Sequence, residues 1–190
     1  MIATIAVLGL LSVATATDLA RHKIYNWTTY PGIVAAWAFH GAGSWLASRG
    51  AVSEAALAQL GWIGIGQSLL GFLACGLTIL AAFVFLKVGG GDVKMIAMLG
   101  AWLGVEAGVT AMLWTFVLGG CVGLIVLVWR VGWWRLTVRV LRQLVWTLRL
   151  RWWAPLSSEE RAQLQPPLYL APCALAAAAI VQFGFMDLIG

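Results

Sequence analysis

Two aspartates, Asp18 and Asp92, combine a reactive side chain with an unusual position, because each lies at one end of a long apolar run. Charged groups are costly at membrane depth, so they tend to be paired or functional. Two carboxyl groups brought together cannot both ionise cheaply, so they can share one proton. The ionised carboxylate then takes a proton from water while the protonated one donates to a carbonyl oxygen. This is the chemistry of an aspartic peptidase.

Three consecutive glycines precede the second aspartate: Gly89, Gly90 and Gly91. Glycine weakens a helix and is used where the backbone bends or where another group comes very close. Irregular backbone at membrane depth is tolerated only where protein or water shields it. We therefore expect a bend in this segment, against which an extended substrate strand lies next to Asp92.

Ordinary ion pairing is the competing explanation for the charged residues. Asp18 would pair with Arg21 or Lys23, and Asp92 with Lys94, as boundary charges without chemistry. That alternative leaves the glycines unexplained. Lys94 itself either anchors the segment at the membrane interface or keeps Asp92 ionised.

The composition is that of a membrane protein. Of 190 residues, 62% are hydrophobic and 10% are charged, and the mean hydropathy is +0.93. A soluble domain has about a quarter of its residues charged. We expect one membrane-embedded domain over residues 1–190. The three cysteines lie singly in apolar segments, and no His, Cys and acid cluster has ligand spacing, so we predict neither a metal site nor a cofactor.

Six apolar segments are candidates for membrane-spanning helices, since about 20 residues cross a bilayer. They cover residues 1–17, 29–47, 61–87, 93–106, 109–129 and 167–186. The first run resembles a signal peptide, but no basic residue precedes it, so we expect it to be retained as a helix. The predicted fold class is therefore all-α, a polytopic membrane protein with six transmembrane helices.

The basic residues are distributed asymmetrically around these helices. With the N-terminus outside, the inner loops 18–28, 87–94 and 130–166 contain eleven of the twelve Lys and Arg residues, all except Arg49. An excess of Lys and Arg marks cytoplasmic loops, so we predict both termini outside. This topology places both aspartates on the cytoplasmic side at similar depth.

Residues 130–153 form a distinct basic segment with six arginines, five tryptophans and no acid. Four of the arginines share one helical face: Arg135, Arg139, Arg142 and Arg149. This pattern predicts an amphipathic helix on the cytoplasmic membrane surface. Because anionic lipid accounts for the arginines, we expect lipid and not nucleic acid as their partner.

The motifs carry a resemblance to a known family. The GxGD pattern of residues 89–92 resembles the signature of intramembrane aspartyl proteases, and Val93 and Lys94 extend the likeness to the prepilin peptidase branch. Asp18 opens a stretch similar to that branch's D-x5-I-P-N motif, in which Ile24 and Asn26 match and Tyr25 replaces the proline. Residues 167–179 resemble the family's last helix, which begins with prolines.

The resemblance implies the residue roles and the substrate. Asp18 and Asp92 would be catalytic, and five residues would bind substrate or shape the loop: Gly89, Gly90, Gly91, Lys94 and Asn26. The substrate would be a type IV or Flp-like prepilin, whose short basic leader is removed at the cytoplasmic face of the inner membrane. Members that also methylate the product often carry a tetracysteine insert after the first helix. This chain has only the short connection 18–28 there, which implies a small Tad/Flp-type peptidase without methylation. The archaeal preflagellin peptidases are the alternative branch.

A non-enzymatic function is the alternative to peptidase activity. The chain would then be a small transporter or assembly subunit whose aspartates bind an ion or a proton. A transport path would place charges near the bilayer midplane. Both aspartates lie toward one face instead, which favours the peptidase.

Overall fold

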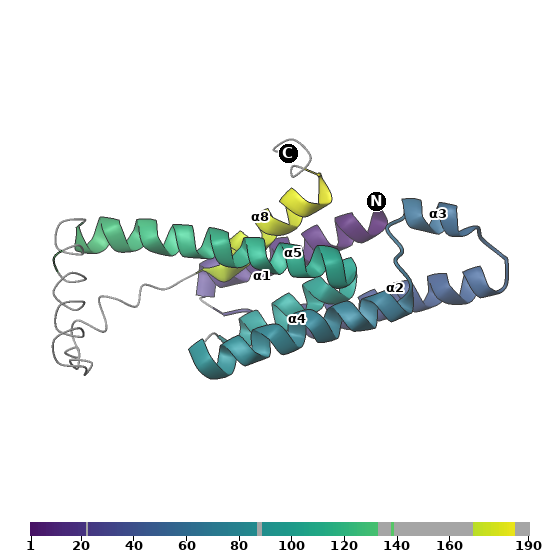
Figure 1. Ribbon diagram of the computed structural model, residues 1–190, viewed down its shortest axis with the longest axis horizontal. Helices are drawn as coiled ribbons and strands as arrows, with labels where there is room; N and C mark the ends of the chain where they lie inside the picture. Colours follow the sequence, from purple (N-terminus) through teal and green to yellow (C-terminus); the bar gives the residue numbers. More distant parts are fainter. Residues whose placement is uncertain (22, 87–88, 133–137, 139–168, 185–190) are drawn as a thin grey trace. The chain divides into compact units, whose positions relative to one another are not determined.

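The structure is a computed structural model that describes residues 1–21, 23–86, 89–132, 138 and 169–184 (Figure 1). All elements within these residues are α-helices, which confirms the predicted all-α class. The helices are α1 (Ile2–Arg21), α2 (Asn26–Ser48), α3 (Glu54–Gln59), α4 (Ile65–Leu86), α5 (Gly90–Val131) and α8 (Leu170–Gln182).

The chain divides into two compact units, which we describe separately. The first comprises Met1–Val117 and Tyr169–Gly190, and it contains both aspartates and the residues of the candidate site. The second, Leu118–Leu168, is described only at the end of α5 and at residue 138. The predicted amphipathic helix over 130–153 thus lies almost entirely outside the described residues. It stays a prediction, as does the single domain over 1–190.

Three helical segments of the described chain are long and apolar enough to cross a membrane: Ile2–Arg21, Ile65–Phe85 and Gly90–Trp129. This supports a membrane protein. The segment predicted over 29–47 corresponds to α2, which has 23 residues but is not apolar enough to count among these three. The segment predicted over 167–186 corresponds to α8, whose 13 residues are fewer than the roughly 20 that span a bilayer. The count of six spans stays a prediction.

Helix α5 consists of two segments that meet at Gly104. This residue has φ 81° and ψ −171°, a conformation that only glycine adopts without strain. The chain turns back on itself here, because a Cβ on Gly108 would lie 3.0 Å from Gly100 Cα. Residues eight apart in a straight helix are separated by about 12 Å. The sequence predicted separate helices over 93–106 and 109–129, so the break occurs earlier than expected.

The first segment of α5 is the centre of the first unit. Residues 95–104 are all buried, which explains how so short a helix can lie at membrane depth. It packs closely against α4, where a Cβ on Gly71 would overlap the backbone oxygen of Gly100. The buried Ser68 hydroxyl donates to the Ala101 carbonyl at 2.6 Å. On the α2 side, Trp102 Nε1 donates to the Gly32 carbonyl at 3.0 Å. These contacts fix the axial position of this segment of α5 relative to α2 and α4.

The glycine contact between α4 and α5 generates a stability prediction. We expect Gly71→Ala to destabilise the fold by about 1 to 3 kcal/mol, because the added methyl overlaps backbone that cannot move aside. Gly66→Ala in the same helix is the matched control, since a Cβ there meets nothing within 4 Å. Thermal unfolding in detergent, followed by circular dichroism, compares the two. Equal stability of the two variants would contradict the close packing of α4 against α5.

Candidate active site

Helix α1 carries Asp18 into the interior of the first unit. The buried residues of α1 recur every three or four positions and form one face: Ala3, Val7, Leu11, Ala14 and Asp18. This face packs against α8 and α2. Asp18 is only 8% exposed, although it belongs to the last turn of the helix. Apolar packing along α1 therefore decides where this carboxyl group lies.

Helix α5 supplies the second carboxyl group from its first turn. Asp92 is partly buried, and its carboxyl group is hydrogen-bonded by the backbone of Gly89. The Asp92 N–H in turn donates to the Gly89 carbonyl at 3.0 Å. This reciprocal arrangement resembles a capping box, in which a side chain in the first turn satisfies backbone groups at the helix start. The first turn of α5 thus fixes the direction of the Asp92 side chain.

The structure brings the two aspartates together. They are distant in sequence, yet they lie close enough in space to interact electrostatically. The end of α1 and the beginning of α5 meet at the same end of the first unit, so the carboxyl groups share one environment. The sequence analysis placed both carboxyl groups on one side of the membrane at similar depth, and their role as a catalytic pair stays a prediction.

The three glycines have different surroundings. A Cβ on Gly89 would lie 2.9 Å from Asp92 Oδ2, and one on Gly91 would lie 3.0 Å from Ile24 Cβ. A Cβ on Gly90 would meet nothing closer than Phe83 Cε2, at 4.0 Å. The predicted bend is absent at Gly90 and Gly91, which are helical and have no positive φ. Gly89 and Gly91 permit close approach instead, and the middle glycine is free to vary, as the x of GxGD indicates.

Lys94 connects α5 to the start of α2. Its Nζ donates to Asn26 Oδ1 at 2.8 Å and lies 4.9 Å from the ring centroid of Tyr30. Asn26 is the first residue of α2, so this bond holds the segment after Asp18 against the segment after Asp92. These contacts attach Lys94 to α2, and its anchoring at the membrane interface stays a prediction.

The connection between α1 and α2 has its own internal bond. Arg21 donates from its guanidinium to the Tyr25 hydroxyl at 3.1 Å. Tyr25 occupies the position where the prepilin peptidase motif has proline, and it is the N-cap residue of α2 with extended backbone. The tyrosine thus shapes the turn through a side-chain hydrogen bond where proline would act through its ring.

Sequence reasoning missed the contribution of α8 to this site. The Ala171 N–H donates to Asp18 Oδ2 at 3.4 Å, within the interior. No motif marked Ala171, because a backbone donor leaves no signature in side-chain chemistry. The apolar run over 167–186 and the prolines at its start predicted a helix here, but not its contact with Asp18.

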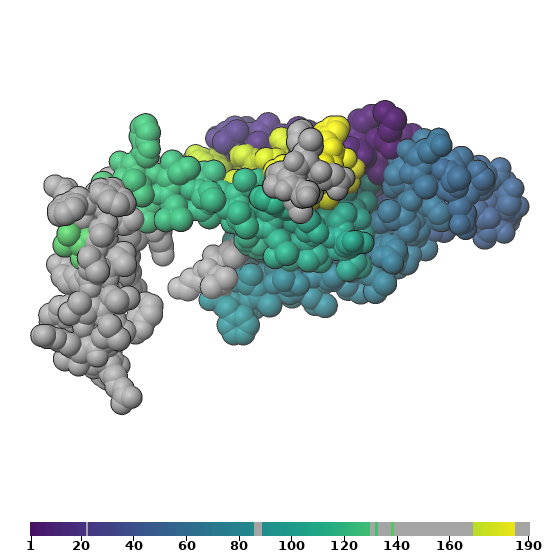
Figure 2. Space-filling model, turned by 45° about the horizontal axis from the view of Figure 1, so that its top comes forward, coloured from purple at the N-terminus to yellow at the C-terminus, as the bar shows by residue number. Residues whose placement is uncertain are grey.

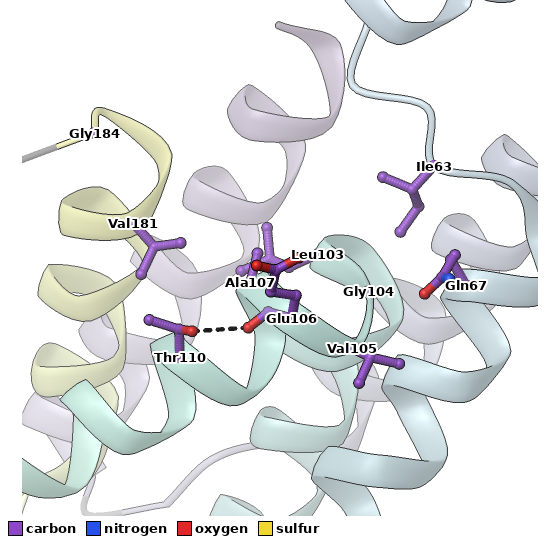
Figure 3. Close-up of a pocket in the computed structure, with 10 residues that line it drawn as sticks. All are labelled: Ile63, Gln67, Leu103, Gly104, Val105, Glu106, Ala107, Thr110, Val181 and Gly184. Atoms are coloured by element: carbon purple, nitrogen blue, oxygen red, sulfur yellow. Dashed lines mark hydrogen bonds between the residues drawn. The ribbon is translucent and has the colours of Figure 1, made fainter. Parts of the chain in front are cut away.

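Two cavities among the described residues of the first unit are relevant to the site. The larger, of about 510 Å³, surrounds the reversal at Gly104 and includes Gln67, Glu106 and Thr110 (Figure 3). Gly104 is twelve residues beyond Asp92, or about 18 Å along a helix, so this cavity is not at the aspartate pair. A smaller apolar groove of about 250 Å³ between α2, α4 and α5 reaches Val93 and Lys94, the two residues that follow Asp92 in the sequence.

Comparison with known protein families shows to which family the chain belongs. The type IV leader peptidase family matches residues 5–124, more than half of the chain, including both aspartates and the glycines. The chain belongs to the type IV leader peptidase family. Membership implies cleavage of leader peptides from precursor proteins. No curated protein sequence and no solved structure matches the chain.

The surroundings of the three glycines predict that alanine is tolerated at one position and not at the other two in this leader peptidase. Gly89→Ala should lower the cleavage rate roughly 10- to 100-fold, because the methyl displaces the Asp92 carboxyl group. Gly91→Ala should also lower it, since Ile24 must shift. Gly90→Ala is the matched control and should cleave at close to the native rate. Rates are measured with purified protein in detergent and a leader-bearing precursor, and a loss in Gly90→Ala equal to the others would contradict this reading.

Proposed function

We propose that this leader peptidase is an aspartic endopeptidase whose catalytic pair is Asp18 and Asp92. The observation that carries the proposal is the pairing of two carboxyl groups from separate helices in one largely buried environment. Like charges are expensive there unless the pair shares a proton. Among the described basic residues near the pair, Lys94 donates to Asn26 and Arg21 donates to Tyr25.

The reaction uses both protonation states of the pair. The ionised carboxylate removes a proton from water, and the water oxygen bonds to the carbon of the scissile carbonyl. The protonated carboxyl group donates its proton to the carbonyl oxygen, giving a neutral tetrahedral intermediate. A proton then passes to the amide nitrogen, the C–N bond breaks, and the products are a carboxylic acid and an amine. The chemistry needs only two carboxyl groups and water, so the proposal includes no metal and no cofactor.

The surroundings of the pair suit a peptide that arrives from outside the bilayer. Gly89 and Gly90 are exposed and Asp92 is partly exposed, so the pair can be reached. Two carboxyl groups attract a basic leader. The apolar groove beside Val93 and Lys94 suits an apolar stretch on the membrane side of the scissile bond. We therefore propose a type IV or Flp-like prepilin as the substrate, with a short basic leader.

The short connection after α1 supports a peptidase without methylation. Helix α1 ends at Arg21 and α2 begins at Asn26, which leaves no space for a cysteine-rich insert. We propose that the chain is a small Tad/Flp-type member in the inner membrane, with the aspartates at the cytoplasmic face. The basic residues on that side of the chain, including the segment 130–153, support this orientation and an anionic lipid partner.

Removal of either carboxyl group tests the proposal. We expect Asp18→Asn and Asp92→Asn each to abolish cleavage of a co-expressed prepilin, because neither amide can hold or donate the shared proton. Both proteins should insert and fold, since asparagine is nearly isosteric with aspartate. Size on a denaturing gel reports cleavage, and detergent extraction with gel filtration reports folding.

Glu106→Gln is the control for loss of a carboxyl group elsewhere. Glu106 lines the cavity at the Gly104 reversal, away from the pair, so this variant should cleave normally. Full cleavage by either folded Asp→Asn variant would refute the aspartic mechanism. If folded native protein leaves every plausible precursor intact, the ion- or proton-binding alternative is tested next by ion-dependent thermal stabilisation.

A further inference from the structure

The first turn of α2 carries two buried hydroxyl groups that have no hydrogen-bond partner. Thr28 is 3% exposed and Thr29 is 1% exposed, and neither Oγ1 atom bonds any group in the described part of the chain. Buried polar groups are nearly always hydrogen-bonded, either within the protein or to ordered water. Two exceptions at adjacent residues therefore indicate a site whose partner is not a protein group.

Contacts one turn farther along α2 place these hydroxyl groups close to the aspartate pair. A Cβ on Gly32 would meet Leu10 of α1 and Met98 of α5. Thr28 is four residues before Gly32, so it lies on the same face of α2, toward the space between α1 and α5. Leu10 and Met98 are eight and six residues from the aspartates of their own helices. Along the helix axes, Thr28 therefore lies within about one turn of both aspartates.

The position in the first turn explains why the helix does not satisfy these hydroxyl groups. A serine or threonine within a helix can donate to a carbonyl three or four residues back. Seven described residues do so: Ser12, Thr17, Ser44, Ser48, Thr78, Thr110 and Thr115. For Thr28 and Thr29 the carbonyl that is three and four residues back is that of Tyr25. It already accepts from both of their backbone N–H groups, at 3.1 and 3.4 Å.

Three other buried side-chain atoms of the described chain have no partner: Thr15 Oγ1, Trp37 Nε1 and His40 Nε2. The two ring nitrogens belong to side chains that pack at 75° against aromatic rings, whose faces are weak acceptors. Thr15 is three residues before Asp18, in the last turns of α1. The hydroxyl groups without a partner are therefore all close to the aspartate pair, and no aromatic ring accounts for them.

The enclosure of the two threonines limits what can bind them. The bond from Lys94 to Asn26 and the contact of Gly91 with Ile24 hold α5 against the start of α2. On the other side of α1, the yellow α8 lies against the purple α1 (Figure 2). A peptide would have to separate these helices, whereas water is small enough to enter. Water also matches a hydroxyl group chemically, because each can donate and accept hydrogen bonds.

We propose that the hydroxyl groups of Thr28 and Thr29 bind water on the inner side of the aspartate pair, and that this site supplies the water consumed in cleavage. The inference rests on the proposed aspartic mechanism. A substrate that arrives at the exposed Gly89 and Gly90 covers the outer side of the pair, so water must come from the inner side. Each cleavage consumes one water molecule, whose oxygen enters the new carboxyl group. The threonines position this water, and the aspartates transfer its protons.

Replacement of threonine by valine tests the supply of water, because valine has the same shape and lacks the hydroxyl group. We expect Thr28→Val and Thr29→Val each to lower kcat roughly tenfold, with little change in KM. Thr28→Ser and Thr29→Ser keep the hydroxyl group and should restore most of the rate. The matched control is Thr115→Val, which should cleave at the native rate. Thr115 is fully buried, and its hydroxyl group donates to the Ala111 carbonyl at 2.7 Å.

A measurement without substrate tests the binding of water. Threonine labelled with ¹³C at the methyl group gives NMR signals in detergent, which the valine variants assign. In native protein we expect nuclear Overhauser contacts from water to the methyl groups of Thr28 and Thr29. The methyl group of Thr115 should show none, since its hydroxyl group is bonded within its own helix.

Each outcome decides one part of the inference. If folded native protein shows no water contact at Thr28 or Thr29, the site does not exist. If water contacts are present but the folded valine variants keep the native kcat, the supply role is overturned. A raised KM with unchanged kcat assigns the hydroxyl groups to the substrate peptide and also overturns it. If native protein cleaves no precursor, the proposed function fails, and the water contacts still decide whether the site exists.

Discussion

Two carboxyl groups placed together at one end of a bundle of apolar helices are the most costly feature of this protein. Burial disfavours each negative charge, and each charge disfavours the other. Asp92 meets this cost with the backbone of Gly89 and the first turn of its own helix, and Asp18 with the start of α8. Both aspartates therefore lie at the beginning of a helix, although only one of them belongs to the helix that it faces.

The close approach of backbone segments makes this arrangement possible. Gly91 lies against Ile24, and Lys94 bonds Asn26, so the residues that follow the two aspartates hold one another. Gly71 and Gly100 bring the backbones of α4 and α5 into contact farther along. A larger side chain at Gly71, Gly91 or Gly100 would push the adjacent segments apart and so move the carboxyl groups. The contacts that pack the helices in the interior thus also determine the positions of the two aspartates.

The reversal at Gly104 allows the first segment of α5 to be enclosed by other helices. This segment, buried on all sides, holds Asp92 at a fixed depth, while the chain beyond Gly104 returns past Gly100 and Cys75. In a straight helix of the same length, the segment that follows Asp92 would have fewer helices packed around it. The turn allows a short helix to be enclosed by other helices, and an enclosed helix holds its first residue more rigidly.

The sequence alone determined the class of protein and indicated its family. Hydropathy is a local property, so the composition predicted an all-α membrane protein, and the types and spacing of Asp18, Gly89, Gly91 and Asp92 indicated a peptidase that the family match supports. The tertiary structure decided which groups meet. It showed that Gly90 is not constrained as its neighbours are, that the break lies at Gly104, and that Ala171 reaches Asp18. These facts depend on contacts between segments far apart in the chain and on backbone atoms, and neither appears in a local pattern of side chains.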